Sequence, residues 1–64
     1  MFTNDEISFM KDIGINVNFE SPSYEDLDLM EDEVSAYLEI NGFDDNYDIN
    51  DIGRFCEGII DKVT

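Results

Sequence analysis

Six apolar residues near the end of the chain recur at α-helical spacing, and this pattern constrains the fold more than any other feature. Counted from the first of them, they fall at offsets 0, 3, 4, 7, 8 and 11, which is one face of a helix. Asp48 or Asn50 is placed to cap this helix, and Lys62 suits its C-terminal dipole. Gly53 and Gly58 disfavour a helix, so we expect close backbone packing at both. The six residues are Ile52, Phe55, Cys56, Ile59, Ile60 and Val63.

The beginning of the chain predicts a short helix followed by an extended segment. Thr3 and Glu6 have the spacing of a capping box and Gly14 is a helix-ending residue, so we expect a helix over residues 4–12. Residues 15–19 alternate strictly between apolar and polar types. Since no second segment of this kind exists, we expect an extended connector. The alternative is a strand edge that pairs with a second copy or with a partner.

A longer helix is predicted over residues 22–40. Ser21 is expected to cap it, with Pro22 at the first helical position, and Gly42 marks its end. Its main apolar stripe has the period of a helix. The sequence therefore predicts an all-α fold, a small three-helix domain with a short extended segment between the first two helices. The stripe consists of Leu27, Met30, Val34, Tyr37 and Leu38.

The length of the chain limits the size of its core. Leu, Ile, Val and Phe account for 19 of the 64 residues, which is enough for folding despite the high net charge. A chain of this length buries only about 60% of its unfolded surface. We therefore expect one acidic helical domain over residues 1–64, with a thin core and no large substrate cleft.

Two features indicate a cytoplasmic location. The longest apolar run has three residues, 36–38, which is too short for a membrane span or a secretory signal. Cys56 is the single cysteine, so no disulfide can form within the chain, as is usual in a reducing compartment.

The residues that usually carry out catalysis are scarce. The chain has no histidine and three Lys and Arg in total, and Cys56 lies on the apolar stripe, where we expect a buried thiol. Gly53 and Gly58 have the spacing of a phosphate-binding loop, but Ile59 and Ile60 stand where lysine and a hydroxyl residue are needed. We therefore expect no enzyme, no catalytic residue and no cofactor.

Calcium binding is the strongest small-ligand alternative. Asn46, Asp48, Asn50 and Glu57 fall at positions 1, 3, 5 and 12 of an EF-hand loop. Asp51, however, stands where the sharp turn of that loop needs glycine. We therefore expect no metal site, and a calcium-binding module stays a minor alternative.

The distribution of charge is the clearest functional signal. The net charge is −14, and the 42 residues from Asp12 to Gly53 contain thirteen acidic side chains and no Lys or Arg. Such a chain repels nucleic acid and anionic membranes and attracts a basic protein surface. A solvated acidic face without a specific partner accounts for the same charges. The acids predicted to bind a partner are Glu25, Asp28, Asp32 and Glu39 on the second helix and Asp44, Asp45, Asp48 and Asp51 in the following turn.

A minor apolar line accompanies the acids of the second helix. Leu29, Ala36 and Ile40 lie off its main stripe, at offsets 0, 7 and 11. We expect this line to face the third element of the domain. Alternatively, it is an exposed docking strip bordered by acids, where apolar contact gives affinity and charge selects a basic partner.

Three groups of residues carry a family resemblance: Asp12-Ile13-Gly14-Ile15 with Asn18-Phe19, Tyr37-Leu38 with Asn41-Gly42-Phe43-Asp44 and Tyr47, and Cys56-Glu57 with Ile59-Ile60-Asp61-Lys62. They resemble those of short acidic uncharacterised proteins of Gram-positive gut bacteria and their mobile elements. The resemblance spans nearly the whole chain and implies no catalytic residues. By size and charge alone, the chain is also similar to phage-encoded DNA mimics such as anti-restriction and anti-CRISPR proteins.

These observations predict a non-enzymatic acidic protein that binds a basic protein surface. A DNA-mimic-type inhibitor of a nucleic-acid-binding protein is the specific form we expect, without direct contact to nucleic acid or membrane. The alternative is a structural protein that self-associates, for example as a homodimer, through the minor apolar line or the edge at residues 15–19.

Overall fold

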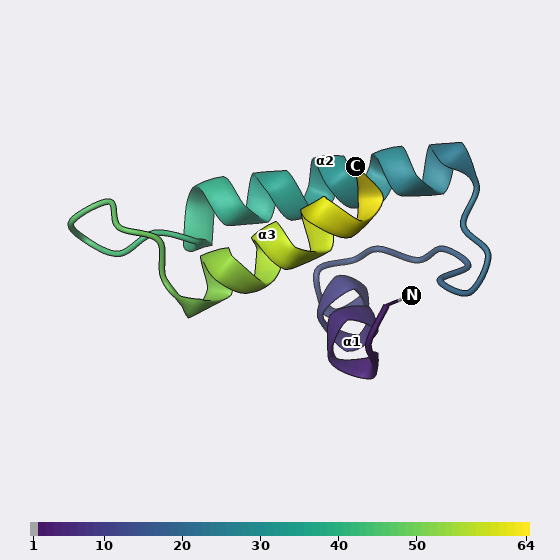
Figure 1. The fold of residues 1–64 in the computed structure, drawn as a ribbon, viewed down its shortest axis with the longest axis horizontal. Helices are drawn as coiled ribbons and strands as arrows, with labels where there is room; N and C mark the ends of the chain where they lie inside the picture. The colour runs from purple at the N-terminus through teal and green to yellow at the C-terminus, as the bar shows by residue number, and fades with distance from the viewer. Residues whose placement is uncertain (1) are drawn as a thin grey trace.

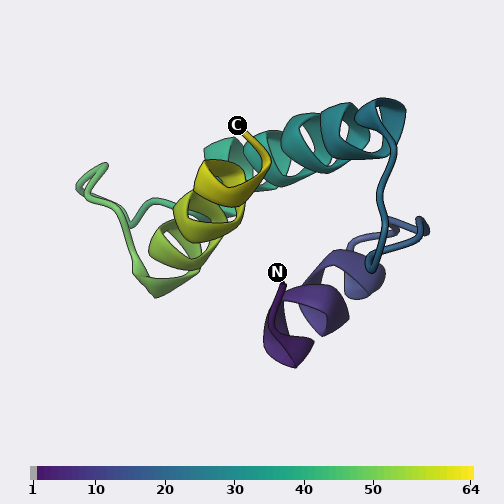
Figure 2. The ribbon, with the colours of Figure 1, turned by 45° about the vertical axis from the view of Figure 1, so that its right-hand side comes forward.

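The computed structural model describes residues 2–64 and has three α-helices, so the predicted all-α three-helix fold is confirmed. Helix α1 spans Asn4–Asp12, α2 spans Tyr24–Asn41 and α3 spans Asp51–Val63. Helices α2 and α3 run antiparallel and side by side, while α1 lies across them on one side, seen almost end-on in Figure 1 and more from the side in Figure 2. The molecule measures 38 × 20 × 19 Å along its principal axes.

Helix α1 has the bounds predicted from the sequence. The Glu6 N–H donates to the Thr3 hydroxyl at 3.1 Å, and the Thr3 N–H donates to the Glu6 carboxylate at 2.8 Å, which completes the capping box. At the other end Gly14 has a φ of 97°, a conformation that glycine adopts without steric cost. The N–H of Ile15 then reaches the carbonyl of Met10 at 2.9 Å, so the helix ends in a Schellman motif.

Helix α2 begins two residues later than predicted. Its cap is Ser23 instead of Ser21, and Pro22 lies outside the helix. The hydroxyl of Ser23 accepts the Asp26 N–H, and the Asp26 carboxylate accepts the Ser23 N–H, both at 3.1 Å. A cap at Ser21 would have placed Tyr24 at the reciprocal position, where it offers no acceptor to the backbone. The capping box at Ser23 provides hydrogen-bond acceptors for two backbone N–H groups and therefore determines where α2 begins.

The core lies where the three helices and the connector meet. Ile15 and Phe19 of the extended segment are 1% and 8% exposed, which confirms that residues 15–19 form a connector pinned by its apolar side chains. No strand forms there; in the part of the chain that the structure describes, the one β-bridge joins Phe43 and Ile49. The buried apolar residues are Met10, Ile15, Phe19, Met30, Val34, Cys56 and Ile59.

The corner between α2 and α3 depends on two glycines in close contact. A Cβ on Gly42 would lie 3.0 Å from the Cα of Gly53, and a Cβ on Gly53 would collide with the carbonyl oxygen of Gly42. The expected close packing is therefore confirmed at Gly53. The same expectation is wrong at Gly58, where an added Cβ would meet nothing within 4 Å.

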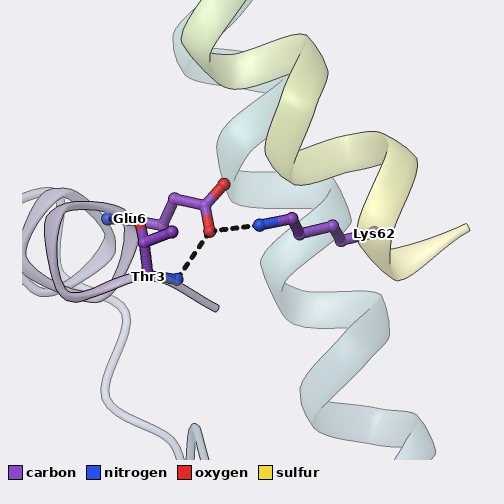
Figure 3. A network of polar contacts seen from close by, with 3 residues as sticks. All are labelled: Thr3, Glu6 and Lys62. Atoms are coloured by element: carbon purple, nitrogen blue, oxygen red, sulfur yellow. Dashed lines mark hydrogen bonds and ion pairs between the residues drawn. The ribbon is translucent and has the colours of Figure 1, made fainter. Parts of the chain in front are cut away.

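Helix α1 is attached to the other two helices by one ion pair and by aromatic contacts. The ammonium of Lys62, in the last turn of α3, lies 2.7 Å from the Glu6 carboxylate (Figure 3). The ring of Phe9 meets the rings of Tyr37 and Phe55 edge to face, with centroids 5.1 and 5.4 Å apart. These contacts place α1 on the core side of both α2 and α3.

Among residues 2–64, no helix combines the length and the apolar composition that crossing a membrane requires.

Candidate functional site

Four acids predicted to bind a partner form a row along the outer side of α2. All four are exposed, whereas Met30 and Val34 on the inner side of the same helix are fully buried. At about 100° per residue, Glu39 lies opposite Met30 on the helix. From Glu25 to Glu39 the row advances fourteen positions along the helix, which is about 21 Å at 1.5 Å per residue. We call these residues, Glu25, Asp28, Asp32 and Glu39, the acidic row.

The minor apolar line of Leu29, Ala36 and Ile40 lies beside the acidic row and is exposed. The exposed fraction is 42% at Leu29 and 81% at Ile40. The expectation that this line faces the third element is therefore wrong. The reason is that α1 contacts α2 through Phe9 and Tyr37, on the same side of α2 as α3, so the outer side of α2 has no helix against it. The alternative arrangement, an exposed strip bordered by acids, is the one present.

The predicted acidic turn is exposed but has an internal structure that the sequence did not reveal. A β-bridge between Phe43 and Ile49 closes the turn. One carboxylate oxygen of Asp44 accepts the N–H groups of Asn46 at 2.9 Å and Asp48 at 3.0 Å. Asp44 therefore holds the turn together, in addition to any contact with a partner. The exposed acids here are Asp44, Asp45, Asp48 and Asp51.

The acids of the row and the turn form no ion pair in the described part of the chain. The structure contains one ion pair within residues 2–64, between Glu6 and Lys62. Of the other two cations, Lys11 lies 6.0 Å from the centre of the Phe19 ring, and Arg54 is exposed on α3. The negative charge of α2 is therefore not neutralised within the described part of the chain.

The two groups with shifted pKa values lie away from the acidic row. Burial raises the pKa of Glu6, but hydrogen bonds from Lys62 and from the Thr3 backbone outweigh it, and the pKa falls below its ordinary value of 4.5. Burial raises the pKa of the Cys56 thiol. Since the thiolate is the reactive form, Cys56 is poorly suited to act as a nucleophile.

The residues of the calcium alternative do not form a binding loop. Asn50 caps α3 by accepting the Gly53 N–H at 2.8 Å, and its amide donates to the carbonyl of Asn41 at 2.9 Å. Glu57 lies within α3, so the second half of the would-be loop is helical. In residues 2–64, no three acidic or cysteine side chains gather closely enough to hold a metal ion. Calcium binding thus gains no support from the structure.

We compared the chain with protein-family models, curated proteins and solved structures. None of the three comparisons finds a match. The resemblance to short acidic proteins of gut bacteria therefore stays a prediction. The functional interpretation depends on the surface itself.

One surface feature was missed by the sequence analysis. A shallow apolar hollow of about 270 Å³ lies between α1 and the start of α3, lined by Phe9, Asp51, Ile52 and Phe55. Ile52 and Phe55 belong to the predicted core stripe of α3, but they are 43% and 36% exposed. The periodicity of α3 gave no signal of this, because spacing within one helix does not show which part of its apolar face a neighbouring helix covers.

Proposed function

We propose that this protein is a non-enzymatic binding protein whose acidic row engages the basic surface of a nucleic-acid-binding protein. The acidic turn, Asp44 to Asp51, extends the same interface. The observation that carries the proposal is the row of four exposed carboxylates on α2, none of which forms an ion pair within residues 2–64. A surface that is anionic over about 21 Å complements a cationic groove that otherwise binds phosphates.

The placement of the acids supports mimicry of a nucleic-acid strand. Glu25, Asp28 and Asp32 follow one another at three and four positions, which places their Cβ atoms about 5–6 Å apart, comparable to the separation of phosphates along a strand. Glu39 lies two turns further along the same side, about 10 Å from Asp32. The inner side of α2 is anchored by the fully buried Met30 and Val34, so the carboxylates sit on a fixed backbone. Charges that are already in position lose less conformational entropy on binding than charges on a flexible tail.

The minor apolar line supplies a second component of the interface. Leu29 and Ile40 are exposed next to the acidic row, and Ala36 lies between them along the helix. Burial of apolar surface provides affinity, while the acids select a basic partner and speed its approach.

Self-association through the same line is disfavoured by charge. Each copy has a net charge of −14, and two copies joined through Leu29 and Ile40 would bring their acidic rows close together. A basic partner relieves that repulsion, whereas a second copy increases it. Sedimentation is expected to give a monomer at high micromolar concentration, and a dimer would favour the structural role instead.

The proposal is tested with two charge variants of equal size. The first, Glu25→Gln, Asp32→Asn, Glu39→Gln, neutralises three acids of the row. The control, Glu20→Gln, Glu57→Gln, Asp61→Asn, neutralises three exposed acids elsewhere. Binding of both to a panel of purified DNA- and RNA-binding proteins is measured by calorimetry at about 50 and 300 mM salt, which differ strongly in screening.

For a partner in the panel, the row variant is expected to bind roughly tenfold more weakly than the control, at about 0.5 kcal/mol per charge. Affinity should fall with added salt, and excess duplex DNA should displace the protein, because both compete for the same basic groove. Equal affinity of the two variants, or binding that is insensitive to salt, contradicts the proposal.

A further inference from the structure

The hollow between α1 and α3 has apolar walls and an open mouth. Phe9 of α1 and Phe55 of α3 meet edge to face, with centroids 5.4 Å apart, and Ile52 lies one turn before Phe55. Ile52 and Phe55 keep 43% and 36% of their surface exposed. A volume of about 270 Å³ is sufficient for a single large aliphatic side chain. Such a side chain would remove this apolar surface from water.

The surroundings of the hollow are negatively charged. Asp51 is part of its lining and is exposed. Asp5 and Asp12 lie four residues before and three residues after Phe9, so both are its neighbours on the surface of α1. None of these three acids has an ion-pair partner in the described part of the chain.

The cationic side chains form no ion pair with the acids of this rim in residues 2–64. Arg54 is not part of the lining of the hollow. The ammonium of Lys11 lies 6.0 Å from the centre of the Phe19 ring. The ammonium of Lys62 is held by Glu6 at 2.7 Å. An apolar site with acids around it favours an apolar group that has positive charges on both sides of it. The same site repels fatty acids and other anions.

We infer that this hollow receives an apolar side chain from a lysine- or arginine-rich segment of the partner protein. The inference rests on the proposed function and adds an anchoring site to it. Asp51 connects the two, since it ends the acidic turn and also lines the hollow. A second copy of this chain is a poor occupant, because its net charge of −14 opposes the acidic rim.

The test uses the full chain and two synthetic pentapeptides of equal charge. One has leucine between two lysines on either side, and the other has serine in place of leucine. The leucine peptide is expected to bind about tenfold more tightly, the effect of burying one large aliphatic side chain. In methyl and aromatic NMR spectra, its largest shift changes are expected at Ile52, Phe55 and Phe9.

Two exposed apolar side chains provide a matched comparison. Ile52→Ala removes part of the lining of the hollow and is expected to reduce the preference for leucine to about twofold or less. Tyr24→Ala removes an exposed side chain at the start of α2, outside the hollow, the acidic row and the minor apolar line, and should leave the preference unchanged. Both side chains are well exposed, at 43% and 89%, so both variants are expected to fold, which circular dichroism verifies.

Each result bears on the inference in one direction. Equal affinity for the two peptides, shift changes confined to Leu29 and Ile40, or no binding of either peptide overturns it. If the leucine preference is absent while the acidic-row variant still loses affinity for its partner, the proposed function stands and only the anchoring site fails. If the leucine preference is present but the acidic-row variant behaves like its control, the hollow stands and the α2 interface fails.

Discussion

Glu6 and Lys62 are separated by 56 positions in the sequence, yet their charged groups lie 2.7 Å apart. The oxygen of Glu6 that accepts from Lys62 also accepts the N–H of Thr3 at 2.8 Å (Figure 3). One carboxylate oxygen therefore caps the first helix and attaches it to the last. The start of α1 and its docking onto α3 are consequently coupled.

Substitution of Glu6 tests this coupling. Glu6→Gln retains a side chain that can complete the capping box but removes the charge that Lys62 pairs with. We expect the free energy of unfolding in urea to fall by about 1–2 kcal/mol, between the values for exposed and buried ion pairs. Glu57→Gln, at an exposed position of α3, should change it by no more than about 0.5 kcal/mol. Equal effects of the two substitutions would show that the ion pair does not stabilise the fold.

The difference in stability between wild type and Glu6→Gln is expected to depend on pH. Because the pKa of Glu6 is lowered on folding, its contribution is complete above the ordinary value of 4.5 and is lost as the pH falls through the lower pKa of the folded state. The difference in unfolding free energy between wild type and Glu6→Gln is therefore expected to shrink as the solution is acidified below that value. Protonation of the other acids affects both proteins alike and cancels in the difference. A difference that grows on acidification would contradict the assignment.

The glycines of α3 are expected to respond in opposite ways to alanine. Gly53→Ala adds a Cβ that collides with the backbone at Gly42, so we expect a loss of about 1–3 kcal/mol in stability. Gly58→Ala adds a Cβ with nothing within 4 Å and should stabilise the helix by about 0.5–1 kcal/mol. Thermal unfolding of both variants measures the effects. A loss of stability at both positions would mean that α3 packs more closely around Gly58 than the structure shows.

The start of α2 is tested by two serine substitutions. Ser23→Ala removes the cap of α2 and is expected to lower stability by about 1 kcal/mol. Ser21→Ala leaves the helix start intact, because the hydrogen bond at that residue uses its backbone N–H and the side chain of Asn18. Denaturant unfolding distinguishes the two. A larger effect at Ser21 would place the start of the helix where the sequence pattern predicted it.

Salt is expected to stabilise the fold. Of twenty charged side chains, seventeen are acidic, and the structure shows a single ion pair in residues 2–64. Raising the salt from about 20 to about 300 mM shortens the screening length severalfold and weakens repulsion among the acids. The Tm should therefore rise, and it should rise less in the variant with three neutralised acids of the row. A constant or falling Tm would show that the carboxylates lie too far apart to repel one another.

Local signals in the sequence predicted most of the fold. The bounds of α1 follow from a capping box and a glycine that act within a few residues, and the connector follows from its alternating pattern. The start of α2 was misplaced because Ser21 and Ser23 are both capping residues, and the choice between them depends on the side chain of Asp26, which accepts the Ser23 N–H. Contacts between residues far apart in the sequence left no such signal in the amino-acid pattern. The pairing of Glu6 with Lys62 depends on how α1 lies across α3, which no spacing within either helix determines.

The candidate site was predicted in part. All eight predicted acids of the row and the turn are exposed, and so is the minor apolar line, contrary to the expectation that it faces the third element. Helical periodicity identifies which residues share a face, but it does not say which face a neighbouring helix covers. The hollow at Ile52 and Phe55 was missed for the same reason, since it forms between α1 and α3 and not within either helix alone.

The acidic row also determines the ions that surround the molecule. Because no lysine or arginine of the described chain lies against these carboxylates, their charge must be balanced by mobile cations from the solvent. Any basic surface that binds along α2 takes the place of those cations and returns them to bulk solution, where they gain translational entropy. Association at this face would accordingly be driven largely by the release of small ions.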